Sequence, residues 1–220
     1  MKRIILLLFI ASITFSSCKK DEPNPDPEPE PTESVLAYYP LTVGNFWIYE
    51  RSFCDSTWED CTLKSIDTSF VTKDTVINNN TYFKVEGVNP VGQKSTGFLR
   101  DSLDYIVSSS GNIVFSNKDF TTKLSEQYII TGNNDTAFYI YTKMHEEPYS
   151  IQVPAGDFDC LDRRLSLFSK SDNFESERNT HNLFAKGIGP VYNQVMYVNS
   201  GAGFKQELIE FAFVICCEEN

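Results

Sequence analysis

The chain has 220 residues and a formal net charge of −11, from 30 acidic residues against 19 Lys and Arg. An acidic protein is repelled by the phosphates of nucleic acids, so the charge excludes nucleic-acid binding. Aromatic residues make up 14% of the chain, with 17 Phe and 11 Tyr, which suits strands. After the N-terminal segments described next, residues 35–220 are predicted to form a single β domain with room for a proper core.

The N-terminus has the pattern of a secretory signal peptide. Lys2 and Arg3 precede an apolar run over residues 4–13, and small residues stand directly before Cys18. The run is shorter than the roughly 20 apolar residues that a membrane-spanning helix needs. We therefore expect residues 1–17 to be a signal peptide.

The cleavage site resembles a bacterial lipobox, in which a bulky apolar residue and two small residues precede a cysteine. Phe15, Ser16, Ser17 and Cys18 follow that order, although Leu is commonest at the first position and Gly or Ala at the third. The resemblance implies that Cys18 becomes the new N-terminus and is acylated, for example with palmitate. One acyl chain binds a membrane only marginally, whereas three chains give a stable anchor. The alternative is an ordinary signal peptide with a chance cysteine.

The segment after Cys18 is predicted to be a stalk. Residues 21–34 read DEPNPDPEPEPTES, in which proline alternates with Asn, Asp and Glu. Proline cannot donate to a helix or a strand ladder, and the acids repel one another. With nothing apolar to bury, residues 18–34 are expected to form a disordered, extended spacer.

The first residues of this spacer are similar to the export tag of Bacteroidota-type surface lipoproteins. They are Lys19, Lys20, Asp21 and Glu22. The similarity implies a protein anchored in the outer membrane and facing the medium. The alternative is an acidic spacer on a protein that faces the periplasm.

The rest of the chain has the alternating pattern of an all-β fold. About ten short alternating segments are separated by Gly, Asn, Asp or Ser, which predicts an antiparallel meander forming an open or half β-barrel. Asn78, Asn79 and Asn80 divide two β-rich runs and predict a tight hairpin, because Asn tolerates positive φ. A short helix over residues 119–126 is also considered, and it would be the one helix in an otherwise all-β domain.

Three motifs resemble the marks of a large group of uncharacterised Bacteroidota-type exported lipoproteins. They are YYPLTVGNFWIY at 38–49, VPAGDFDC at 153–160 and FAKGIGPVY at 184–192. The resemblance implies an open antiparallel β-barrel similar to the half-barrels of lipoprotein-carrier proteins, and it implies no particular activity. The glycines of these motifs predict turns.

Export places the five remaining cysteines in an oxidising compartment, where disulfides persist. The favoured pair is Cys54 with Cys61, which flank DSTWED; the alternative joins this loop to Cys216 or Cys217. An odd number cannot all pair within the chain, and Cys160 is expected to be a buried, small apolar residue. A zinc site is disfavoured because the 54/61 gap exceeds the usual ligand spacing, so no metal or other cofactor is expected.

No catalytic motif emerges. His145 and His181 are the only histidines, and neither H-E-x-x-H nor G-x-S-x-G occurs. A glycan-acting hydrolase would need two carboxyl groups at a set separation. The candidates are Asp157 and Asp159, which share a strand face, and the cluster Asp172, Glu175 and Glu177. Calcium binding by this cluster lacks the EF-hand order. A solvated charged surface is the favoured interpretation.

The two tryptophans are expected to differ. Trp47 lies in an alternating segment and is predicted to be in the core, whereas Trp58 lies in the polar loop between Cys54 and Cys61. An exposed Trp58 would stack on a sugar or anchor a partner; the alternative is that it covers the disulfide.

The sequence thus predicts a non-enzymatic envelope lipoprotein of the outer membrane, with a binding or structural β domain. Its expected partners are the membrane, through the lipid anchor, and a glycan, an apolar ligand or an envelope protein. The alternative function is the glycan-acting hydrolase.

Overall fold

The computed structural model describes residues 33–130, 132, 135–173 and 175–214, and the compact unit begins at Glu33. The predicted signal peptide and nearly all of the predicted stalk lie outside these residues. Within the described part of the chain, no helix is long and apolar enough to cross a membrane.

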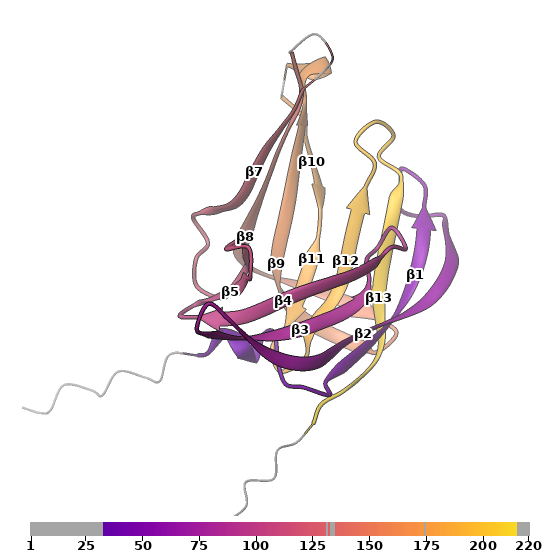
Figure 1. The fold of residues 1–220 in the computed structure, drawn as a ribbon. Coiled ribbons are helices and arrows are strands. Elements are labelled where there is room, and N and C mark those ends of the chain that lie inside the picture. Colours follow the sequence, from indigo (N-terminus) through magenta and orange to yellow (C-terminus); the bar gives the residue numbers. More distant parts are fainter. Residues whose placement is uncertain (1–32, 131, 133–134, 174, 215–220) are drawn as a thin grey trace, which may run out of the picture. The chain divides into compact units, whose positions relative to one another are not determined.

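The described residues form an all-β fold, as predicted, with thirteen strands in one antiparallel sheet (Figure 1). The strands are β1 (Phe46–Cys54), β2 (Cys61–Ile77), β3 (Asn80–Val88), β4 (Lys94–Ser102), β5 (Tyr105–Ser108), β6 (Ile113–Ser116), β7 (Lys123–Ile130), β8 (Thr136–Val153), β9 (Gly156–Ser169), β10 (Glu177–Thr180), β11 (Asn182–Ala185), β12 (Gly189–Met196) and β13 (Gly203–Ala212). Two short 3₁₀ helices, η1 (Val35–Ala37) and η2 (Lys170–Asp172), are the only helices among the described residues.

The sheet curves into a nearly closed barrel, which confirms the predicted open-barrel architecture. Its order is β6-β5-β4-β3-β2-β1-β13-β12-β11-β9-β8-β7, and β10 pairs with β9 beside this path. Most neighbours are consecutive hairpins, as in a meander. The exceptions are the pairing of β9 with β11 and the pairing of β1 with β13, the second of which places the beginning and the end of the domain side by side (Figure 1).

The turns form where the sequence predicts them. Asn78 and Asn79 make the two-residue loop between β2 and β3, with φ of 49° and 62°. Positive φ at both loop residues is what a type I′ hairpin requires. The VPAGDF motif likewise turns between β8 and β9, with Gly156 at φ 140°.

The prediction of a short helix over residues 119–126 is wrong, because these residues form a turn and the start of a strand. The Asp119 carboxylate accepts hydrogen bonds from the backbone N–H groups of Thr121 and Thr122, at 3.1 and 2.9 Å, and so closes a turn. Side-chain capture of this kind competes with continuing a helix. The chain then enters β7, which pairs along its length with β8.

Two of the sequence motifs meet in the core. The Trp47 indole is 1% exposed, and its Nε1 donates to the carbonyl of Ile188 at 2.7 Å. The Tyr49 hydroxyl donates to the carbonyl of Pro190 at 2.8 Å. Between these acceptors, Gly189 has φ of 98°, and an added Cβ would lie 3.3 Å from the indole. Trp47 is therefore a core residue, as predicted, and the glycine is needed for its close approach.

The disulfide Cys54–Cys61 is the pair that the sequence favours, and it joins the end of β1 to the start of β2. The alternative pairing of this loop with Cys216 or Cys217 is therefore not formed; those two residues lie outside the described part of the chain. Cys160 is free and buried, as expected, and burial raises the pKa of its thiol to about 12. Such a thiol is not a reactive nucleophile at neutral pH.

Candidate ligand-binding site

The predicted lipidation and export residues, Cys18 and Lys19 to Glu22, lie outside the described residues.

Trp58 lies in the disulfide loop, where it is half-buried and has a φ of 62°. Its backbone N–H donates to the carbonyl of Asp55. Trp58 does not line either of the two interior cavities described below.

The two histidines lie in different surroundings. His181 packs its ring 4.9 Å from that of Tyr149, and its Nδ1 lies 2.9 Å from Oδ2 of Asp162. Arg164 donates its Nε to the same oxygen at 2.9 Å. The Asp162 carboxylate is completely buried, and one of its oxygens holds both Arg164 and His181, so the three side chains form a hydrogen-bonded cluster. His145 lies on β8, and desolvation lowers the pKa of its imidazole.

The predicted carboxylate candidates lie at or near the surface, although Asp172 is half-buried and its Oδ1 is buried without a hydrogen-bond partner among the described residues. Asp157 and Asp159 are exposed on one face of β9, as alternation predicts, and the hydroxyl of Ser150 donates to Oδ1 of Asp159 at 2.6 Å. Asp172 ends η2, and Glu177 begins β10. Among the described residues, no group of three or more His, Cys, Asp and Glu is arranged to hold a metal ion.

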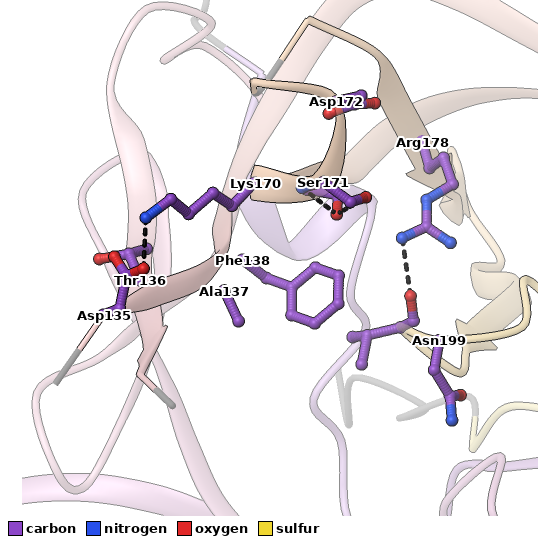
Figure 2. A pocket seen from close by; sticks show the side chains of 11 residues that line it. Asp135, Thr136, Ala137, Phe138, Lys170, Ser171, Asp172, Arg178 and Asn199 are labelled. Carbon is purple, nitrogen blue, oxygen red and sulfur yellow. Dashed lines mark hydrogen bonds and ion pairs between the residues drawn. The ribbon is translucent and has the colours of Figure 1, made fainter. Parts of the chain in front are cut away.

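A wide surface depression of about 640 Å³ lies near η2, and its cations are already engaged. Figure 2 shows Lys170 reaching to Asp135, with which it forms an ion pair, while Arg178 is directed to the backbone. The guanidinium of Arg178 donates to the carbonyl of Val198 at 2.7 Å. Because both charges are satisfied by the chain, this depression is a weak candidate for recognition.

An interior cavity of about 250 Å³ is the stronger candidate, and we call it the aromatic cavity. Its walls combine five aromatic rings with several polar side chains, and they come from both halves of the sheet. The rings are those of Tyr39, Trp47, Tyr49, Phe184 and Tyr192, and the longer polar side chains are Asn89, Arg163, Asn182, Asn193 and Gln206.

A second cavity of about 300 Å³ shares three of these residues, Arg163, Asn182 and Asn193. We call it the aliphatic cavity. Its other walls are mainly the branched and long side chains Ile140, Leu165, Leu167, Val195, Met196 and Val198. Arg163, Leu165 and Leu167 occur at alternate positions of β9, so they project from the same face of the strand.

Arg163 has an unusual environment for an arginine. Its Nε is buried and has no hydrogen-bond partner among the described residues. The phenol of Tyr39 acts on it electrostatically. Burial raises the pKa of that phenol to about 12, so Tyr39 is neutral at physiological pH and supplies no counter-charge.

Arg163 is not among the site residues predicted from the sequence. The available signal is the alternation of LDRRLSLF, in which Leu161, Leu165 and Leu167 occupy one strand face and Arg163 interrupts it. A charged residue at a position where alternation expects an apolar one is either paired in the core or part of a site.

Comparisons with known proteins give limited similarity. No family model matches the chain, and no curated protein matches it. A crystal structure of a provisionally designated lipoprotein from Parabacteroides distasonis is 16% identical, covering 80% of this chain and 98% of that one, with a TM-score of 0.41. An exported protein, also provisionally designated, from Bacteroides fragilis, described as having a YmcC-like fold, is 10% identical, with coverage of 80% and 99% and a TM-score of 0.41.

Proposed function

We propose that the chain is a lipid-anchored lipoprotein of the bacterial outer membrane whose β domain is a non-enzymatic binding module. The ligand occupies the aromatic cavity. Ligand sites are typically concave, largely apolar and furnished with a few polar groups that fix orientation. The observation that carries this proposal is the cavity itself, which is lined by five aromatic rings and by Arg163, whose Nε is buried.

The anchor is Cys18, and the domain faces the medium. The lipobox order before Cys18 supports the anchor, and Lys19 to Glu22 support the orientation. The domain then reaches its ligand from the cell surface, held away from the membrane by the acidic, proline-rich stalk. The alternative orientation faces the periplasm.

Labelling tests the anchor. In cells given a palmitate analogue, the wild-type chain is expected to carry label and the Cys18→Ala chain to carry none, because the thiol is the acylation site. Absence of label on the wild type, or label retained in the variant, contradicts the proposal. Protease added to intact cells then tests the orientation, since protection of the domain indicates the periplasmic face.

The carboxylates support binding over glycan hydrolysis. A general acid at neutral pH needs a carboxyl group whose pKa is raised. Among the residues that the structure describes, no Asp or Glu lines either interior cavity, so the proposed ligand site offers no such group. Asp157 and Asp159, the strand pair considered for hydrolysis, are not part of either interior cavity.

A neutral aromatic probe tests the binding function. N-phenyl-1-naphthylamine, which fluoresces in apolar surroundings, is expected to bind the full-length chain carrying Cys18→Ala saturably and at one site. Asn193→Trp places an indole at the junction of the two cavities, and it is expected to weaken binding at least about tenfold, the equivalent of about 1.4 kcal/mol. Asn199→Trp is the matched control, since Asn199 lines only the surface depression.

Unchanged binding in Asn193→Trp would contradict a ligand in the interior. Loss of binding in Asn199→Trp alone would move the site to the surface depression. Absence of saturable binding in the parent chain would contradict the binding function itself.

A further inference from the structure

The arginines of the domain differ in what compensates their charge. Arg51 pairs with Asp67 at 2.8 Å, and Arg164 pairs with Asp162 at 2.9 Å. Arg178 donates to a backbone carbonyl, and Arg100 donates to the carbonyl of Asp101 and lies over the Tyr82 ring. Within the described residues, Arg163 is the arginine whose side chain makes neither an ion pair nor a hydrogen bond to the protein.

The neighbouring acid is not available to Arg163. Asp162 is adjacent in sequence but projects from the opposite face of β9, where it already binds Arg164 and His181. On the cavity side, the amide of Asn182 is directed to the backbone carbonyl of Arg163 at 3.2 Å and leaves the guanidinium free. The positive charge therefore faces the two cavities without a counter-ion from these residues.

This arrangement is costly unless a ligand completes it. A guanidinium stays protonated in proteins, and a buried donor such as the Arg163 Nε is costly when it has no partner. Its planar set of donors matches the two oxygens of a carboxylate, and related oxyanions, better than any neutral group. The missing partner of Arg163 is accordingly an anion of this shape.

The walls define the rest of the ligand. On one side of Arg163 are aromatic rings, among them Tyr39 and Phe184, and on the other are aliphatic side chains such as Leu165 and Leu167. Rings of this kind pack against a flat apolar body in offset or edge-to-face contacts. A highly charged or purely hydrophilic ligand would leave most of this surface unused.

We propose that the domain binds a small organic acid, with one anionic group held by Arg163 and an apolar, ring-bearing body in the aromatic cavity. This inference rests on the proposed binding function and adds the charge of the ligand. It assigns Arg163 as the residue that selects an acid over its neutral analogue.

Two probes with the same ring system test the proposal. 8-Anilino-1-naphthalenesulfonate differs from N-phenyl-1-naphthylamine by its anionic sulfonate, which stands in for the acid. In Arg163→Met, the anionic probe is expected to bind at least about tenfold more weakly than in the parent chain. The neutral probe is expected to change by no more than about twofold. Arg163→Lys is expected to recover part of the anionic probe's affinity because it restores the charge without the planar donors.

Arg100→Met is the matched control. The Nε of Arg100 is also buried without a partner, but Arg100 lines neither interior cavity. Its replacement is expected to leave the affinities for both probes unchanged. The thermal unfolding of each variant, followed by circular dichroism, shows whether a loss of affinity reflects a loss of fold.

The outcomes separate the two proposals. Suppose that the parent chain binds the neutral probe, and that Arg163→Met weakens the binding of both probes equally or of neither. This result would overturn the proposal that the ligand is an acid held by Arg163, and the binding function would stand. If neither probe binds saturably to the parent chain, the binding function itself is overturned. Equal weakening of the anionic probe in Arg100→Met overturns the assignment of Arg163, because it indicates a general effect of removing one positive charge from an acidic protein.

Discussion

Trp47→Ala is expected to lower the free energy of unfolding by about 3–5 kcal/mol, as measured by urea denaturation. The indole is fully buried, and it packs edge-on against Tyr39 and Phe213, with ring centroids 6.3 and 6.0 Å away. Truncation also leaves the carbonyl of Ile188 without its donor. The loss therefore combines a cavity with an unsatisfied polar group.

Trp58→Ala provides the control for the tryptophan. Trp58 is half-buried in the disulfide loop, so its replacement is expected to change the free energy of unfolding by less than about 1 kcal/mol. Similar losses in the two variants would contradict the assignment of Trp47 as the residue that joins β1 to the turn before β12.

Asp162→Ala is expected to lower the free energy of unfolding by about 3 kcal/mol. The change removes a fully buried carboxylate and leaves Arg164 and His181 without their common acceptor. Breaking a buried pair from one side typically costs 3–5 kcal/mol, and the partial exposure of both partners favours the lower end of that range. Urea denaturation at constant pH measures the effect.

Asp159→Ala is the matched control, because Asp159 lies on the same strand but is exposed and bound by a single hydroxyl. We expect a change within about 0.5 kcal/mol. A loss for Asp162→Ala no larger than that of the control would show that the cluster of Asp162, Arg164 and His181 contributes nothing to stability.

The fold was predictable where its causes are local. Alternation predicts strands, the asparagines at 78 and 79 tolerate the φ values that the hairpin needs, and only six residues lie between the bonded cysteines. The helix considered over residues 119–126 failed because one side chain, Asp119, diverts the backbone N–H groups into a turn. The sequence pattern does not reveal this competition between a side chain and a helix, whereas the hydrogen bonds in the structure do.

The site was not predictable because it depends on which strands become neighbours. Asp162 and His181 are close because β9 pairs with β11, and the aromatic cavity requires β1 to lie beside β13. Neither pairing is local in sequence. Arg163 was visible as a charge on an otherwise apolar strand face, but its lack of a partner depends on every surrounding element.

A crystal structure of the chain with bound 8-anilino-1-naphthalenesulfonate tests the central claim most directly. We expect the ring system in the aromatic cavity, with sulfonate oxygens within hydrogen-bonding distance, about 2.7–3.2 Å, of the Arg163 guanidinium. A probe found only in the surface depression near Lys170 and Arg178, or inside the domain with its sulfonate turned away from Arg163, would contradict it.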